Sequence, residues 1–198
     1  YPAGVPERDF QPLLALMRRR LSEDEVHELG DRLVADGLVP ADRIDVGVGI
    51  TKVTFYRHFR TKSDLVVAYL QQQSEREQQW MKSLRRDEDP TATLRDLAVG
   101  IGDASCRPGF RGCAFINAAA EFSDPSDPVR AAVEAHRSWM LDYFAELAAA
   151  DGSKDAAAVA RQLLLLRDGA MVNGYLNDPT AVAASLGAAL DAIIRGRR

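Results

Sequence analysis

Apolar residues at helical spacing occur along almost the whole chain, and this pattern constrains the fold more than any other feature. Two early sets recur three or four residues apart: Phe10, Leu13, Leu14, Met17 and Leu21, then Val26, Leu29, Leu33 and Val34. Such spacing places apolar side chains on one face of a helix. No segment shows the strict polar and apolar alternation of a half-buried strand. The sequence therefore predicts an all-α fold.

Turn and helix-start sequences divide the second part of the chain at "RRDEDP", "RPGFRG", "SDPSDP", "ADGS" and "NDP". Between them we expect helices at 64–84, 91–106, 113–122, 128–150, 155–175 and 179–195. Thr61 or Ser63 can cap the first of these. Its later part, "QQQSEREQQ", is polar nearly all round. That pattern is typical of a helix that bridges two packed bodies through solvent.

Length and composition exclude several classes of protein. A chain of 198 residues with 46% hydrophobic residues can bury a core as one large domain, or as a small domain joined to a larger one. Cys106 and Cys113 have neither zinc-ligand spacing nor a disulfide framework, so we expect a reducing cytoplasm and no metal. The most apolar run, "RQLLLLRDGAMV", contains three charges, and "YPAGVPERDF" lacks the features of a signal peptide. We expect no membrane partner.

A basic segment interrupts this acidic chain, whose formal net charge is −4. Residues 1–48 hold six bases against ten acids, whereas "GITKVTFYRHFRTKSDL" (49–65) holds four bases, a histidine and three aromatic residues before its first acid, Asp64. Bases on one short helix are often only a solvated face. The residues around these bases decide whether they form a solvated face or a binding surface.

The basic segment has the spacing of a helix-turn-helix. A short helix would end at Val48, Gly49 would form the turn, and a second helix would run over 51–59 with Thr51 as its cap. Val53, Phe55 and Phe59 can face inward. In such motifs the second helix enters the major groove, where bases and hydroxyls meet phosphates and base edges. The predicted DNA contacts are Thr51, Lys52, Thr54, Tyr56, Arg57 and Lys62.

The stretch "GITKVTFYRHFRTKSDLVVAYL" closely resembles the end of the DNA-binding domain of the TetR family of bacterial transcriptional regulators. In that family a glycine turn precedes a Ser/Thr-Lys start, a Thr, an apolar-Tyr pair, a closing Phe and a Lys that opens the next helix. "GFRGCAFINAAAEFSDPSDPVRAAVEAHRSWM" and "ARQLLLLRDGAMVNGYL" resemble its ligand-binding and dimerisation domain. The resemblance runs from Gly49 to the C-terminus. It implies a double-stranded DNA operator, a small-molecule effector and a homodimer, with a DNA-binding domain at 1–63 and a ligand-binding and dimerisation domain at 64–198.

The first quarter departs from the TetR pattern. Between Gly37 and Ile44 the chain is shorter than that pattern, and it lacks the expected threonine and Gly-aromatic pair. Residues 1–53 look more like a small actinobacterial helical family of unknown function. We therefore expect a fusion at "ITKVT", in which the first part of the DNA-binding unit is a substitute.

Several residues of the second part could line an effector cavity, because they combine aromatic and methionine surfaces with a few polar groups. The set is Phe115, Asn117, Phe122, His136, Trp139, Met140, Tyr143, Met171 and Asn173. Most would also serve as ordinary core residues. The polar members are more informative, since a polar group on an apolar face needs a partner. Cys113 is interpreted as a small core residue, because no adjacent base or resolving cysteine marks it as a redox sensor.

Two functions compete. The first is a dimeric DNA-binding repressor in which a mostly apolar effector moves the helix at 64–84; repression is commoner than activation in the family. The second is a helical dimer that has lost DNA binding and serves protein interaction. An enzyme or a cofactor is not expected, because GxSxG, HExxH, GxGxxG and P-loop motifs are absent. We expect dimerisation through the helices at 155–175 and 179–195, with Val159, Leu163, Leu166, Ala170, Leu186, Leu190 and Ile193 as the apolar positions.

Overall fold

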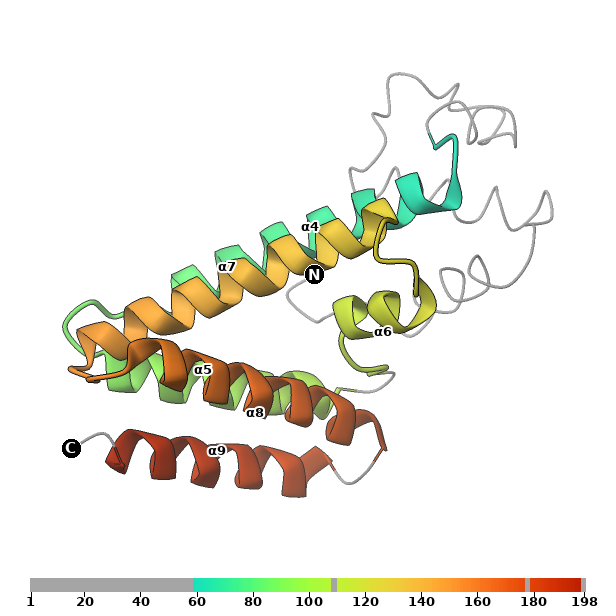
Figure 1. Cartoon of the computed structure of the whole chain (residues 1–198). Helices are drawn as coiled ribbons and strands as arrows, with labels where there is room; N and C mark the ends of the chain where they lie inside the picture. Colours follow the sequence, from blue (N-terminus) through green and yellow to red (C-terminus); the bar gives the residue numbers. More distant parts are fainter. Residues whose placement is uncertain (1–58, 108–109, 177–178, 197–198) are drawn as a thin grey trace, which may run out of the picture.

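The computed structural model describes residues 59–107, 110–176 and 179–196, and its regular structure over these ranges is entirely helical. The helices, labelled as in Figure 1, are α4 (Lys62–Ser83), α5 (Pro90–Ser105), α6 (Ala114–Glu121), α7 (Pro128–Ala150), α8 (Ala156–Leu176) and α9 (Pro179–Arg195). The all-α prediction is confirmed. Each predicted helix in this part of the chain ends within two residues of the observed bounds.

Local chemistry explains where these helices begin. At the start of α4, Thr61 Oγ1 accepts a hydrogen bond from Asp64 N at 3.0 Å, and Asp64 Oδ2 accepts one from Thr61 N at 2.9 Å. This reciprocal pair is a capping box. α5 and α7 begin after Asp89 and Asp127, whose side chains accept from backbone amides of the first turn, and in each helix the next residue is proline.

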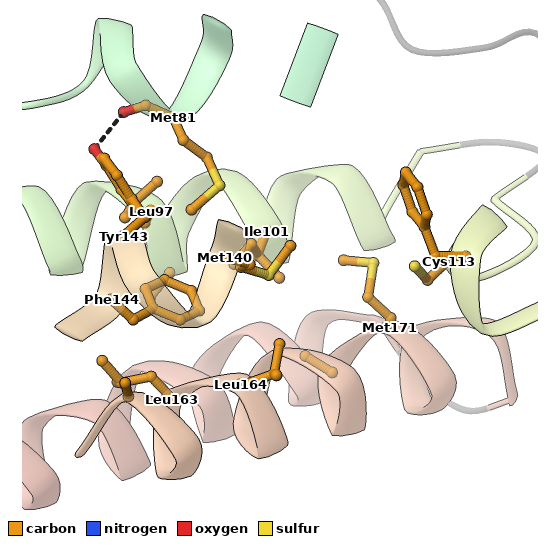
Figure 2. Packing of buried hydrophobic residues seen from close by; sticks show 14 of the residues in the cluster. Met81, Leu97, Ile101, Cys113, Met140, Tyr143, Phe144, Leu163, Leu164 and Met171 are labelled. Carbon is orange, nitrogen blue, oxygen red and sulfur yellow. Dashed lines mark hydrogen bonds between the residues drawn. The ribbon is translucent and has the colours of Figure 1, made fainter. Parts of the chain in front are cut away.

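The helices form two layers (Figure 1). In one layer α4 and α7 lie side by side and run in the same direction, with α6 close to the start of α7. In the other layer α5 packs mainly against α9 and α8. α7 contacts α8 and α5 as well as α4, so it joins the two layers. The apolar core lies between them and extends from Tyr143 and Phe144 to Met171 and Cys113 (Figure 2).

Small residues bring α5 close to its neighbours. A Cβ atom on Gly100 would overlap the indole of Trp80 on α4, and one on Gly174 of α8 would lie 2.5 Å from Ser105 Cβ. These glycines are used for close helix contact rather than for unusual backbone angles. At the far end of the core, Tyr143 Oη donates to Met81 O at 2.9 Å, which joins α7 to α4 (Figure 2).

The polar half of α4 does not cross solvent, so that prediction was wrong. Ser74 and Glu77 are only partly exposed, and they lie in helical register between the buried Leu70 and Met81. This half of α4 packs along α7. Polar residues can occupy the inward face because α7 and α8 present polar partners there.

The apolar positions expected to pair with a second copy mostly face inward instead. Val159, Leu163, Ala170, Leu186 and Leu190 are all buried within the protomer. Leu166 and Ile193 are partly buried against the same core. The prediction of a dimer interface was therefore wrong for the five buried positions, whose side chains are covered within the protomer. α7 and α5 pack against α8, and α5 and α8 pack against α9, so the inner faces of both helices are covered.

Candidate functional site

A cluster of polar side chains lies inside the protomer where α4, α6, α7 and α8 meet. We call it the buried polar cluster; its members are Ser74, Glu77, Cys113, His136, Arg167 and Asp168. Helical register places them inside. Arg167 is in step with the buried Leu163 and Ala170 on α8, and His136 lies between the buried Val133 and Met140 on α7.

Arg167 is the centre of the cluster, with a side chain only 6% exposed. Its Nη2 donates to Glu77 Oε1 at 2.8 Å, and its Nη1 donates to Cys113 Sγ at 3.0 Å and to Asp168 Oδ1 at 3.2 Å. Burial lowers the pKa of Arg167, but Glu77 and Cys113 raise it above its usual value. The guanidinium therefore stays charged and ties α8 to α4 and to the start of α6.

Glu77 balances that charge. Burial of the Glu77 carboxylate raises its pKa, but Arg167 and His136 outweigh this effect and lower the pKa to about 2. Glu77 is therefore an anion at neutral pH. A second charge pair continues the cluster toward the surface, since Arg137 Nη1 lies 2.8 Å from Asp168 Oδ2.

His136 is held on three sides. Its ring stacks on Phe115 with centroids 3.6 Å apart and planes 5° apart. Its Nδ1 lies 2.9 Å from Ser74 Oγ, which already accepts a hydrogen bond from Gln78 Nε2 at 3.0 Å. The Ser74 hydroxyl can therefore donate to Nδ1, and this arrangement leaves Nε2 protonated. His136 Nε2 faces Glu77 Oε2 at 3.3 Å.

Five of the predicted ligand residues are buried in the same interior: Phe115, His136, Met140, Tyr143 and Met171. Trp139 is partly buried and stacks on Tyr143 with centroids 5.3 Å apart. These six of the nine predicted residues share one interior but are spread along it, with Tyr143 at the end near Met81 and Met171 at the end near Cys113 (Figure 2).

The other three lie apart from this group. Asn117 donates from Nδ2 to Arg111 O at 3.0 Å and so supports the turn before α6. Phe122 follows the end of α6, beside the start of α4. Asn173 lies on the exposed side of α8, where its amide donates to Gly169 O at 2.8 Å. The expectation that Asn173 faces the core was wrong, because residue 173 is one position out of register with the buried Gly174.

Glu77 and Arg167 are the residues that the sequence analysis missed, although a signal was present. Arg167 interrupts an apolar run but keeps its helical register, and Glu77 follows the period of Leu70 and Met81. The statement that no base lies near Cys113 was also wrong, since Arg167 contacts its sulfur. That base comes from 54 positions away in the chain, so no local pattern shows it.

At the start of α4, the structure describes two residues to which the sequence analysis assigned a role in the predicted DNA-binding helix or in DNA contact, Phe59 and Lys62. Phe59 is buried, in agreement with its predicted inward position. Lys62, the first residue of α4, lies with Nζ 3.7 Å from Glu121 Oε1 and 5.2 Å from the centroid of the Phe122 ring. The predicted contacts Thr51, Lys52, Thr54, Tyr56 and Arg57 lie outside the described residues.

Within residues 59–107, 110–176 and 179–196, no group of three or more His, Cys, Asp or Glu side chains is placed to hold a metal ion. No described helix is long and apolar enough to cross a membrane.

Comparison with solved structures finds a TetR-family transcriptional regulator from Streptomyces coelicolor. It is 36% identical in sequence, the match covers 96% of this chain and 95% of that chain, and the TM-score is 0.70. The chain belongs to the TetR family of transcriptional regulators. A second structure, described as a TetR transcriptional regulator from Streptomyces avermitilis, has the same fold at 21% identity, with 92% and 97% of the two chains covered and a TM-score of 0.58.

The first part of this TetR-family chain also matches another family. The model described as "Protein of unknown function (DUF3349)" matches residues 1–75. This agrees with the resemblance of residues 1–53 to a family of unknown function, and the match extends into α4. The Streptomyces coelicolor structure leaves only 4% of the chain uncovered, so the TetR likeness begins well before Gly49. A search of curated proteins finds no match.

Membership of the family changes how the geometry is interpreted. A family of transcriptional regulators agrees with the prediction that the chain is not an enzyme. In this TetR-family chain, α4 is the element that follows the predicted DNA-binding segment, and it is also the element that carries Ser74 and Glu77. The buried polar cluster and the start of α4 are therefore the two candidate sites, and one helix joins them.

Proposed function

We propose that this TetR-family chain is a dimeric, cytoplasmic DNA-binding repressor that a small, mostly apolar effector releases from its operator. The observation that carries the proposal is the continuity of α4. One uninterrupted helix runs from Lys62, next to the predicted reading helix, to Glu77 in the buried polar cluster. Fifteen residues of α-helix span about 22 Å. A displacement at the cluster would therefore move the reading helix.

DNA contact would come from Thr51, Lys52, Thr54, Tyr56, Arg57 and Lys62. We assign Lys52 and Arg57 to base edges, and Tyr56 and Lys62 to phosphates. Lys62 follows the end of the predicted reading helix (51–59) by three positions in the sequence, which supports its inclusion. Loss of a base-edge contact would relax sequence preference, whereas loss of a phosphate contact would weaken binding to all sequences alike.

The effector would bind near His136, where aromatic and methionine side chains adjoin charged groups. Phe115, Met140 and Met171 supply apolar surface, and His136 and Glu77 supply hydrogen-bonding groups. A mostly apolar molecule with one polar group matches this composition. By separating α4 from α7 or from α6, such a molecule would alter the position of Lys62.

Dimerisation would use the exposed side of α8 and α9. Leu165, Val172 and Leu176 are 72%, 42% and 66% exposed, and their spacing of seven and four residues places them on one side of α8. Over residues 181–194 of α9 the exposed positions are small: Ala181, Ala184, Ser185, Ala188 and Ala192. Apolar side chains beside small ones allow two copies to pack as a four-helix interface.

The first test is DNA binding itself. Fluorescence anisotropy of the intact protein with a labelled duplex from the intergenic DNA upstream of its gene, measured at two salt concentrations, should give an affinity that falls as salt rises. A binder of the predicted kind would also prefer this duplex to a scrambled one. Binding to neither duplex at low ionic strength would refute the repressor.

The second test concerns the effector. A bound effector should raise the melting temperature and weaken DNA binding reciprocally. Replacing Met171, which is buried beside the cluster, with Trp should reduce both responses, whereas the same change at the exposed Asn173 should reduce neither. Equal responses in both variants would move the site away from the cluster.

The alternative function is a helical dimer that uses its first quarter for protein interaction, and its basis is that residues 1–75 match a second family, one of unknown function. In that case the basic segment would be a solvated remnant of a DNA-binding ancestor. The anisotropy experiment separates the two, because only the repressor shows salt-dependent binding to duplex DNA.

A further inference from the structure

The start of α4 is clamped to the corner between α6 and α7. Lys62 Nζ lies 3.7 Å from Glu121 Oε1 at the end of α6 and 5.2 Å from the centroid of the Phe122 ring. One residue later, Ser63 Oγ donates to Asp127 Oδ2 at 2.9 Å. Three contacts therefore hold the first turn of α4 against this corner.

The Lys62 contacts are the ones that matter for DNA. The Lys62 ammonium carries its charge on a single nitrogen, Nζ. A DNA phosphate oxygen would therefore have to approach the same Nζ atom that now faces Glu121 Oε1. The Lys62 and Glu121 side chains are 33% and 36% exposed, so DNA could reach the pair. A phosphate that approached would meet the negative charge of Glu121 as well as the positive charge of Lys62.

We propose that Glu121 competes with a DNA phosphate for Lys62, so that the end of α6 lowers the affinity of this protein for its operator. This inference rests on the proposed function, because it requires that the chain binds DNA. It concerns a residue outside both the reading helix and the predicted effector set. α6 links this contact to the buried polar cluster, because Cys113 at the other end of α6 accepts a hydrogen bond from Arg167. A displacement at the cluster could therefore change the distance between Glu121 and Lys62.

The experiment compares Glu121→Gln in two backgrounds. In the chain with Lys62, the substitution should tighten binding to a labelled duplex about two- to fivefold, as expected for a partly exposed ion pair. In the Lys62→Ala background it should change binding by much less. Glu134→Gln, which removes an acid from the exposed face of α7, is the matched control for net charge.

Salt dependence supplies an independent readout. A Lys62 side chain that no longer pairs with Glu121 can neutralise a DNA phosphate more fully, and each neutralised phosphate releases a counterion from the DNA. The slope of log K against log salt should therefore become steeper in Glu121→Gln, by up to about 0.9 for each phosphate contacted. Glu134→Gln should leave this slope unchanged.

Three results would overturn the inference. Equal tightening in the Lys62 and Lys62→Ala backgrounds would show a general effect of negative charge rather than competition for one side chain. Unchanged binding in Glu121→Gln, with wild-type protein that does bind DNA, would refute competition while leaving the proposed function intact. Failure of the wild-type protein to bind any duplex at low ionic strength would remove both proposals together.

Discussion

Each side of α8 carries an exception to the usual distribution of polar and apolar residues. On the inner side, Arg167 is 5% exposed and contacts Glu77 and Cys113. Two positions earlier, on the outer side, Leu165 is 72% exposed. Burying a charge costs free energy unless partners are placed precisely, and exposing leucines in a row is unfavourable for a monomer. Each side therefore points to something beyond simple core formation.

The two sides of α8 differ in where the partners of their unusual residues come from. The inner side is satisfied within the protomer, because Glu77, Cys113 and Asp168 all reach the guanidinium of Arg167. The apolar residues of the outer side instead match a second copy of the chain, as proposed above. Substitutions on the inner side should therefore lower the free energy of unfolding, whereas substitutions on the outer side should weaken dimerisation.

The largest effect is expected from Arg167→Met. Removing one partner leaves the Glu77 carboxylate, whose side chain is 24% exposed, without its main counter-charge, which should lower the free energy of unfolding by about 3–4 kcal/mol, the lower part of the range for buried pairs. The double variant Glu77→Met with Arg167→Met should recover most of this loss, since no unpaired charge remains. Urea unfolding at fixed protein concentration measures both. A double variant as unstable as the single one would show that packing, rather than charge, dominates the inner side.

The next effect is pH dependence on the same side. The pKa of Glu77 is lowered from 4.5 to about 2 in the folded protein, so its contribution is fully present above pH 4.5 and is lost as pH falls toward 2. That contribution is about 3 kcal/mol. Stability measured between these pH values should fall more steeply in the wild type than in Glu77→Gln. Parallel curves would mean that other carboxylates control the acid transition.

A smaller effect is expected on the outer side. Leu165→Asp places a charge in the proposed interface of both copies and should weaken dimerisation by about 2 kcal/mol or more, which is at least tenfold in Kd. Light scattering at micromolar concentration should show a shift toward monomer. Val99→Asp on α5, where Val99 is 63% exposed, is the control and should leave the dimer intact. A wild-type protein that is already monomeric would refute the proposed interface.

The smallest effect separates two serines, Ser74 in the buried polar cluster and Ser138 on the exposed face of α7. Ser74→Ala removes the hydroxyl that lies 2.9 Å from His136 Nδ1 and should cost about 1 kcal/mol. Ser138→Ala, at an exposed position of α7, should change stability by less than about 0.5 kcal/mol. Thermal unfolding of the two variants under identical conditions gives the comparison. Equal losses would mean that the hydroxyl of Ser74 contributes no more than a surface group.

Much of the fold was predictable because helix boundaries depend on neighbouring residues. Thr61 and Asp64 cap α4 from three positions apart, and Asp127 with the proline after it starts α7. The site was predictable only in part. Phe115 and His136 were found as aromatic residues at apolar positions, and the structure stacks them. Their polar partners were missed, because a polar stretch on α4 resembles a solvated face until its neighbours are known.

The sequence by itself determined the helical class, the order and limits of the described helices, and the resemblance to TetR regulators, because capping, helical period and motif spacing all act over a few residues. Tertiary structure alone decided which charges lie inside. Arg167 meets Glu77 across 90 positions of the chain, and Ser74 meets His136 across 62. Tertiary structure also decided which apolar faces stay exposed, since α5 covers one side of α8 and α9 and leaves the other uncovered within the protomer. A periodic pattern shows that a helix has an apolar face, but only the packing of distant segments shows what that face contacts.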